Sequence, residues 1–398
     1  MELEKIDGGV TAPKGFLAGG MACGIKKDLP DLGLLSSTKE ARAAGVFTTN
    51  LVKAAPVLVS SQQIKRGKAR AIIANSGNAN ACTGEEGLKD AWTMVESTAK
   101  ALEVPPEEVL VCSTGVIGEP LPIEAIQKGI ESLAANISPQ GGETFARAIM
   151  TTDSFPKSTA LEVTTSQGTF RMGGAAKGAG MIHPSMATML AFITTDLEIE
   201  APALREALKK AVDISFNRIS VDGDTSTNDT VLILANGSSG VKGQGEALQA
   251  LKEGLKKICQ ELAHMIVRDG EGATKVVKIL VKGAPSDREA EMAARRMANS
   301  LLVKTALHGE DPNWGRLAAA LGSSGCRVEP ERLQIWIGEV QIVKGGMGLP
   351  QAEDPAHQVM RKREYTITLD LGLGPGEYWM WTCDLTYEYV RINAEYRS

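Results

Sequence analysis

The sequence lacks the long apolar runs of a membrane protein and the basic excess of a nucleic-acid-binding one. No stretch approaches the roughly 18 apolar residues that a spanning helix needs, and residues 1–7 carry no basic segment followed by an apolar run. The formal net charge is −5, with Lys and Arg scattered among Asp and Glu, so no patch is expected to follow a phosphate backbone or an anionic membrane. We therefore expect a cytoplasmic protein that binds neither nucleic acid nor membrane.

Metal-binding and disulfide patterns are missing as well. The six cysteines are far apart and form no CxxC pair, and the four histidines are isolated from one another. Such spacing fits neither a zinc site nor a disulfide scaffold. We expect no metal, and most cysteines are predicted to be small core residues. The cysteines are Cys23, Cys82, Cys112, Cys259, Cys326 and Cys383.

The sequence does contain enough apolar residues for a substantial core. At 398 residues and 43% hydrophobic composition, the chain can form one large or two medium domains. Apolar residues at helical spacing predict helices within 88–102, 123–133, 204–212, 248–265 and 290–301. Short apolar runs predict strands at 57–60, 71–74, 109–112, 160–164, 190–196, 231–235, 276–280, 334–343, 365–371 and 379–385. Strands separated by long helices indicate a layered α/β architecture.

The stretch 177–190 joins an irregular segment to a buried strand. Glycines and a proline keep its first half out of regular structure, and the apolar run from Leu190 follows at once. Thr188 lies at this junction, directly after Ala187, where a rigid strand could hold a nucleophile beside an accessible loop. If the bond between them were cut, the new α-amine of Thr188 could act as its base. A binding protein whose loops hold a ligand remains the alternative.

Several other loops follow strands and carry polar groups. Thr114 and Gly115, where the strand 109–112 is expected to break, could supply donors to a developing oxyanion, although an ordinary strand-to-helix turn explains them equally. Adjacent Thr151 and Thr152 offer hydroxyls to a polar substrate, but threonine is also a good strand residue. Glu271, between two glycines, could bind an amino group.

Eight motifs carry a resemblance that covers nearly the whole chain. In order, they are GVFTTN, NSGNANACTG, STGVIG, MTTD, KGAGMIHPSMATML, DGDTSTNDT, DGEGATK and DPNWGR. Together they resemble the ornithine acetyltransferase family, also called the bifunctional arginine biosynthesis protein or glutamate N-acetyltransferase. The resemblance implies a layered α-β-β-α sandwich, of a kind shared with self-processing aminopeptidases, and a smaller C-terminal α/β lobe from about residue 280.

The resemblance also implies a reaction. A precursor cleaves itself between Ala187 and Thr188 into an α chain, 1–187, and a β chain, 188–398, which assemble as two α and two β chains. Thr188 then takes acetyl from N-acetylornithine and passes it to glutamate, which releases ornithine and N-acetylglutamate within the cyclic arginine biosynthesis pathway. No cofactor is needed, and whether acetyl-CoA also serves as a donor stays open. A self-processing aminopeptidase that hydrolyses peptides with an N-terminal nucleophile is the alternative.

Particular residues are implied for this chemistry. Thr114 and Gly115 match the oxyanion-hole pair. Lys177 could pair with the substrate α-carboxylate and Glu271 with its positive amine. The full set of implied substrate contacts is the Thr151–Thr152 pair, Lys177, Thr188, Glu271, Asn393 and Ser398.

Overall fold

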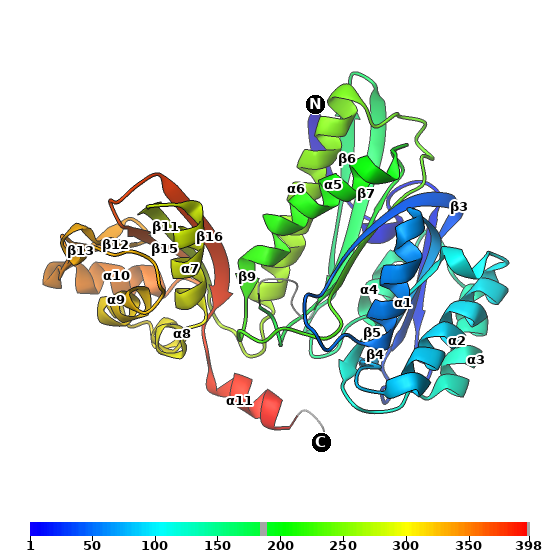
Figure 1. Cartoon of the computed structure of the whole chain (residues 1–398), viewed down its shortest axis with the longest axis horizontal. Helices are drawn as coiled ribbons and strands as arrows, with labels where there is room; N and C mark the ends of the chain where they lie inside the picture. Colours follow the sequence, from blue (N-terminus) through cyan, green and yellow to red (C-terminus); the bar gives the residue numbers. More distant parts are fainter. Residues whose placement is uncertain (184–188, 396–398) are drawn as a thin grey trace. The chain divides into compact units, whose positions relative to one another are not determined.

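The computed structural model describes residues 1–183 and 189–395, and the chain divides into two compact units (Figure 1). The first unit comprises residues 1–217 and 224–266, and the second comprises 218–223 and 267–398. The second unit corresponds to the expected smaller C-terminal lobe but begins earlier than residue 280. The predicted cleavage pair, Ala187 and Thr188, falls within the sequence range of the first unit and outside the described residues.

The first unit is built on a mixed nine-stranded sheet with the strand order β1-β6-β7-β8-β10-β3-β4-β5, in which β2 also pairs with β3. The strands are β1 (Glu2–Ile6), β2 (Phe16–Met21), β3 (Leu32–Phe47), β4 (Lys68–Asn78), β5 (Val109–Val116), β6 (Lys157–Thr165), β7 (Gly168–Lys177), β8 (Leu190–Thr195) and β10 (Thr230–Ala235). The helices are α1 (Ala55–Gln63), α2 (Gly84–Leu102), α3 (Ile123–Ala134), α4 (Gly142–Ala148), α5 (Ala201–Asp213) and α6 (Gly245–Arg268), whose last two residues belong to the second unit.

Helices cover this sheet at separate places. α1 and α2 pack against β5, and α2 also packs against α3. α6 lies against β7, where a Cβ built on Gly174 would come within 2.9 Å of Ile258 and 3.0 Å of Leu262. Phe145 and Phe192 meet edge to face at 5.3 Å inside a further cluster of buried apolar residues. The central strands β8 and β10, parallel to each other, are buried along their whole length, as continuous apolar strands should be.

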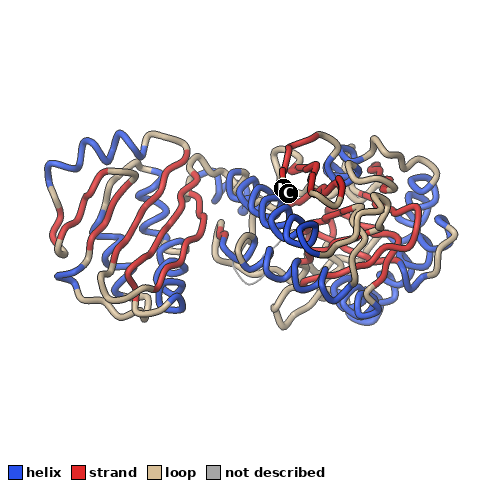
Figure 2. Tube along the Cα trace, turned by 90° about the horizontal axis from the view of Figure 1, so that it is seen from above, coloured by secondary structure: helices blue, strands red, loops and turns tan. Residues whose placement is uncertain are grey.

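The second unit contains a seven-stranded mixed sheet with the order β14-β13-β12-β15-β11-β16-β9. Its strands, most of which Figure 2 shows side by side, are β9 (Ile219–Ser220), β11 (Val276–Ala284), β12 (Gln334–Ile337), β13 (Val340–Lys344), β14 (Met347–Gly348), β15 (Glu364–Asp370) and β16 (Gly376–Cys383). Its helices are α7 (Asp287–Ala298), α8 (Leu301–His308), α9 (Trp314–Gly322), α10 (Glu353–Met360) and α11 (Tyr387–Ala394).

The two faces of this second sheet differ. Alternate residues of its strands join one apolar cluster with helices α7 to α10. The opposite positions carry half-buried tryptophans and cations, among them Lys278 at 5.0 Å from the Trp379 ring and Lys282 at 5.4 Å from that of Trp336. One face of the sheet is therefore sealed by helices, and the other presents aromatic rings paired with positive charge.

Most predicted elements are confirmed, and the α/β class is confirmed with them. The run 57–60 is wrong as a strand, because Pro56 at the first turn starts helix α1 and a short apolar run alone cannot distinguish the two. The run 334–343 is two strands, since Gly338 turns the chain at φ +58° between β12 and β13.

The structure also bears on the cysteines and on membrane-spanning helices. Cys112, Cys259, Cys326 and Cys383 are buried and unpaired, which confirms them as core residues, whereas Cys82 is exposed. Across residues 1–183 and 189–395, no helix is both long and apolar enough to cross a membrane.

Candidate active site

The predicted oxyanion pair lies where two parallel strands approach unusually closely. β4 and β5 are in register with Ser76 opposite Thr114 and Gly77 opposite Gly115. Gly115 has φ +135°, and a Cβ built on it would lie 2.2 Å from the carbonyl carbon of Gly77. Only glycine fits this position, for both its backbone conformation and its contact.

The strand does not break where the sequence predicted. β5 continues through Thr114 and Gly115 to Val116, because the facing glycine leaves the two backbones room to remain paired. A bulge at Asn78 then disturbs the ladder, and such irregularities redirect backbone groups at the end of a strand. Thr114 is thus held on a strand and almost fully buried.

Lys177 ends strand β7 and reaches the same place. Its Nζ lies 3.3 Å from Oγ1 of Thr114, and the residue is only 2% exposed. Lys177 is therefore a buried lysine and not a solvated surface one. In the sheet Lys177 pairs with Leu190, the first residue of β8. The structure therefore brings together Thr114, Gly115 and Lys177 from two segments far apart in sequence.

Asp153 organises the loop beside this lysine. Its carboxylate accepts hydrogen bonds from Lys157 Nζ at 2.6 Å, from the Gly178 backbone N–H at 2.7 Å and from the Thr151 N–H at 2.9 Å. Burial alone would raise the pKa of Asp153, but the charges of Lys177 and Lys157 outweigh it and hold that pKa below its ordinary value. A buried carboxylate thus joins the backbone of Thr151, one of the predicted substrate-binding threonines, to the residue that follows Lys177.

Thr151 and Thr152 themselves are half-buried and follow helix α4. The backbone of Thr151 is fixed by Asp153.

The chain is described again at Met189, directly after the predicted nucleophile Thr188. The Met189 N–H donates to Asp229 Oδ1 at 2.9 Å, and its carbonyl accepts from the Thr230 N–H at 3.1 Å. Asp229 is fully buried, and its Oδ2 has no hydrogen-bond partner among the described residues. Burial raises the pKa of this carboxyl well above its ordinary value. A buried carboxyl group with a raised pKa is therefore placed next to the start of β8.

A second group of predicted residues lies in the second unit. Asn393 Nδ2 donates to Glu271 Oε2 at 2.7 Å, so the amide of helix α11 orients the carboxylate. Thr386 caps α11 and donates through Oγ1 to the Gly272 carbonyl at 2.9 Å. The loop and the helix that carry the pair are thus tied to each other. Ser398, the remaining predicted contact, lies outside the described residues.

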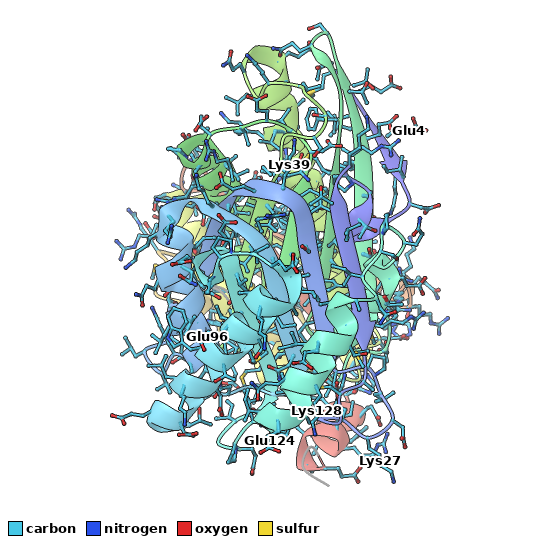
Figure 3. All side chains as sticks on the ribbon, turned by 90° about the vertical axis from the view of Figure 1, so that its right-hand side faces the viewer. Glu4, Lys27, Lys39, Glu96, Glu124 and Lys128 are labelled. Atoms are coloured by element: carbon cyan, nitrogen blue, oxygen red, sulfur yellow. The ribbon has the colours of Figure 1, made fainter. Side chains whose placement is uncertain are left out.

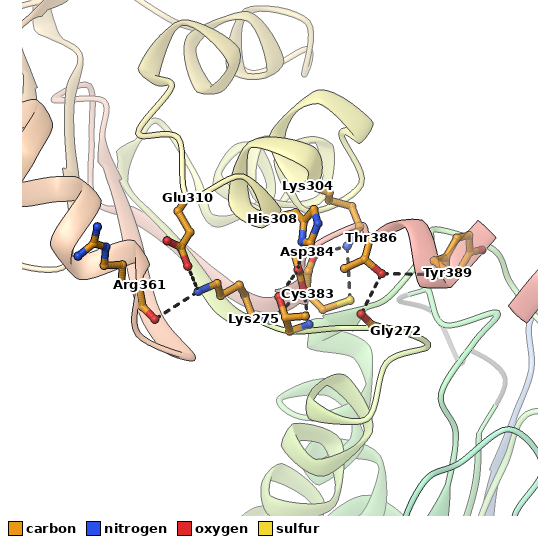
Figure 4. A network of polar contacts seen from close by, with 11 residues as sticks. Gly272, Lys275, Lys304, His308, Glu310, Arg361, Cys383, Asp384, Thr386 and Tyr389 are labelled. Carbon is orange, nitrogen blue, oxygen red and sulfur yellow. Dashed lines mark hydrogen bonds and ion pairs between the residues drawn. The ribbon is translucent and has the colours of Figure 1, made fainter. Parts of the chain in front are cut away.

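A network of polar contacts around Asp384 also holds the segment that follows Glu271 (Figure 4). Asp384, whose side chain is fully buried, accepts from the N–H and hydroxyl of Thr274 at 2.8 and 2.6 Å and from the Lys275 N–H at 2.8 Å. Lys275 extends to Glu310 at 2.6 Å. His308 Nδ1 approaches Asp384 at 3.2 Å. Three residues after Glu271, the backbone is therefore clamped by a carboxylate.

The residues that sequence reasoning missed all act through tertiary contacts. Asp153 and Asp229 stand inside the quoted motifs MTTD and DGDTSTNDT, yet nothing local indicates that they face a buried lysine and the start of β8. Half-buried Lys26, whose Nζ donates to the Met150 carbonyl at 2.8 Å, belongs to no recognised motif.

Comparison with known proteins decides the family. The model of the ArgJ family matches residues 17–398. This chain belongs to the ArgJ family. It is 49% identical to the arginine biosynthesis bifunctional protein ArgJ of Symbiobacterium thermophilum, with all of both chains covered, and 46% identical to that of Bacillus licheniformis, covering 100% of this chain and 98% of the relative. The resemblance drawn from the motifs is confirmed.

Solved ArgJ-related chains are similar in sequence over part of the length. A chain of arginine biosynthesis bifunctional protein ArgJ from Bacillus halodurans is 42% identical, covers 47% of this chain and 98% of its own, and has a TM-score of 0.44. A chain of ornithine acetyltransferase from Mycobacterium tuberculosis, solved in complex with ornithine, is also 42% identical, covers 46% of this chain and 99% of its own, and has a TM-score of 0.43.

Proposed function

We propose that this ArgJ-family chain is an autoprocessed acetyltransferase that moves acetyl from N2-acetyl-L-ornithine to L-glutamate through an acetyl-threonine. The observation that carries the proposal is the family match along 17–398, a range that includes every residue given a role. The contact of Lys177 with Thr114 supports it, because a cation, a hydroxyl and a close-packed glycine strand meet at one buried point.

The processing step activates the nucleophile. The Thr188 hydroxyl attacks the Ala187 carbonyl carbon, the peptide C–N bond breaks, and the nitrogen gains a proton as an ester forms. Water then hydrolyses the ester and leaves residue 187 with a free carboxylate and Thr188 with a free α-amine. That amine, whose ordinary pKa is near 7.7 to 8.0, can take the hydroxyl proton within the same residue.

Transfer follows in two half-reactions. The Thr188 oxygen attacks the acetyl carbonyl of N-acetylornithine, and the acetyl C–N bond breaks as ornithine leaves with the proton. The α-amine of glutamate then attacks the acetyl ester, the C–O bond breaks and the threonine oxygen regains its proton. Each tetrahedral intermediate carries an oxyanion, for which Thr114 and Gly115 are the proposed donors.

Substrate charge is matched by the remaining residues. Lys177 pairs with the α-carboxylate, beside the Thr151–Thr152 pair, and Glu271, oriented by Asn393, binds the side-chain ammonium of ornithine. Ser398 is proposed as a further contact. The energy of the amide is kept in the ester, so the transfer consumes neither ATP nor a resident cofactor. We also propose that acetyl-CoA serves as a second acetyl donor and that the enzyme is cytoplasmic. Two α and two β chains are proposed to form the assembly.

Two measurements test it. Denaturing mass analysis of active enzyme should give two chains divided at 187/188, and intact material with full activity would refute the processing step. Thr188→Ala should abolish both cleavage and ornithine-dependent acetyl exchange, whereas Thr169→Ala, at an exposed position of β7, should change neither. Peptide hydrolysis without acetyl exchange would instead identify an aminopeptidase.

A further inference from the structure

Lys26 belongs to a loop whose backbone is fixed by a buried carboxylate. Asp31, fully buried, accepts hydrogen bonds from the backbone N–H groups of residues 23 to 26 at 2.6, 3.1, 2.7 and 2.9 Å. Four donors on one carboxylate hold the loop in a single conformation. The Lys26 side chain therefore starts from a rigid base rather than from a free surface loop.

The aliphatic part of Lys26 lies over the strands that carry the oxyanion pair. A Cβ built on Gly77 would come within 2.8 Å of Lys26 Cγ, so the lysine stem fills the space above this glycine. Gly77 in turn lies against Gly115, where an added Cβ would approach it to 2.2 Å. Lys26, Gly77 and Gly115 thus form three consecutive layers in direct contact.

The ammonium group of Lys26 extends toward the predicted substrate-binding threonines. Nζ donates to the carbonyl of Met150 at 2.8 Å, one residue before Thr151. The residue as a whole is half-buried. A lysine ammonium has three N–H donors, and this backbone contact uses one of them.

A second lysine, Lys177, lies close enough to Lys26 to repel its charge. Within the described part of the first unit, Lys26 forms no ion pair, and Asp31 is already committed to backbone donors. Asp153 is bonded to Lys157 at 2.6 Å with both side chains fully buried. Besides Asp31 and Asp153, the charge that acts on Lys26 is that of Lys177, which is positive. An anionic group bound here would relieve the repulsion between Lys26 and Lys177.

We propose that Lys26 binds the α-carboxylate that N-acetylornithine and glutamate share, together with Lys177. The proposal rests on the function proposed above. The α-carboxylate is attached to the same carbon as the reacting nitrogen, so its partner must stand close to the oxyanion pair. Lys26 stands close to the oxyanion pair, because its aliphatic side chain rests on Gly77, which contacts Gly115. A side-chain group of the substrate lies several bonds further away.

The test compares two donors in a single turnover. N-acetylornithine and its α-carboxamide differ only in the charge at the proposed contact, and acetylation of the enzyme is followed by denaturing mass analysis after rapid quenching. Wild-type enzyme should prefer the acid by at least about tenfold, the size of one charge-assisted hydrogen bond. Lys26→Met should lose most of this preference by reacting more slowly with the acid and almost unchanged with the amide.

Matched variants separate recognition from folding. Lys27→Met removes the same charge from the next residue, which is exposed (Figure 3), and should retain the wild-type preference. Lys26→Gln keeps a donor without the charge and should lose the preference as Lys26→Met does, while Lys26→Arg should retain much of it. Melting temperatures of all four variants show whether each is folded.

Other results would contradict either the role of Lys26 or the proposed function. The role of Lys26 is overturned if Lys26→Met prefers the acid over the carboxamide as strongly as wild type does. If Lys26→Met does not fold, the same result with Lys26→Gln overturns it. A defect confined to glutamate as acceptor, with normal acetylation from N-acetylornithine, also overturns it and places the lysine at the glutamate side chain. Failure of wild-type enzyme to become acetylated by N-acetylornithine refutes the proposed function itself and is recognised before any variant is made.

Discussion

Replacing Gly115 by alanine should damage catalysis far more than its single added carbon suggests. Two costs arise from the structure. At φ +135° an L-residue is strained, and the new Cβ would lie 2.2 Å from Gly77 C, 2.4 Å from Asn78 N and 2.6 Å from Gly77 O. These neighbours are backbone atoms, so β4 and β5 must separate. We expect roughly 1–2 kcal/mol for the conformation and a further 1–3 kcal/mol for the overpacking.

Gly118→Ala is the matched control. Gly118 also has positive φ, +85°, but no atom lies within 4 Å of a Cβ built there. It should lose only the conformational part, roughly 1–2 kcal/mol, which corresponds to a melting temperature lower by about 2–8 °C. Gly115→Ala should melt lower still. The comparison isolates the strand separation from the effect of positive φ.

The decisive assay is acetyl exchange between ornithine and N-acetylornithine, measured well below both melting temperatures. Displacing one oxyanion donor costs about 10²- to 10³-fold in rate, so Gly115→Ala should fall by that factor while Gly118→Ala stays near wild type. If Gly115→Ala exchanges acetyl within about threefold of Gly118→Ala, the reasoning that the close strand contact positions the oxyanion donor is refuted.

Three further changes test other parts of the structure. Asp153→Asn leaves Lys157 buried without its charge partner and should lower the free energy of unfolding in urea at pH 7 by about 3–5 kcal/mol. Because the native pKa of Asp153 is lowered, this loss of stability should shrink as pH falls below the ordinary value of 3.8. A loss that does not depend on pH would contradict the charge pairing of Asp153. Asp229 has a raised pKa, so wild-type stability should fall as pH rises from 3.8 toward that pKa, and Asp229→Asn should remove this slope. An unchanged slope in urea unfolding measured across this pH range would show that Asp229 is not its source. Asp384→Asn should loosen the loop that carries Glu271 and raise KM for N-acetylornithine several-fold with little change in kcat, whereas a fall in kcat alone would argue against a binding role.

The sequence predicted the main strands and helices because their apolar periodicity is local. It failed where local pattern is ambiguous: the run 57–60 forms helix α1, whose Ser60 hydroxyl bonds both backbone groups of Val111 in β5. The roles of Asp153 and Lys26 were beyond reach for another reason. A carboxylate that joins Lys157 to Gly178, or a lysine that rests on Gly77, depends on residues brought together only by the folded sheet.

The strand order of the first unit bears on what a chain cut would do. β8 and β10 lie side by side between β7 and β3. A break between 187 and 188 would therefore assign the two inner strands to one polypeptide and both flanking strands to the other. The 188–398 product would hold only β8 and β10 of this sheet, and the 1–187 product would hold two groups of strands with a gap between β7 and β3. The two pieces could separate only if this sheet unfolded, so the first unit of the processed enzyme should melt as one cooperative body, and neither fragment should rebuild that unit without the other.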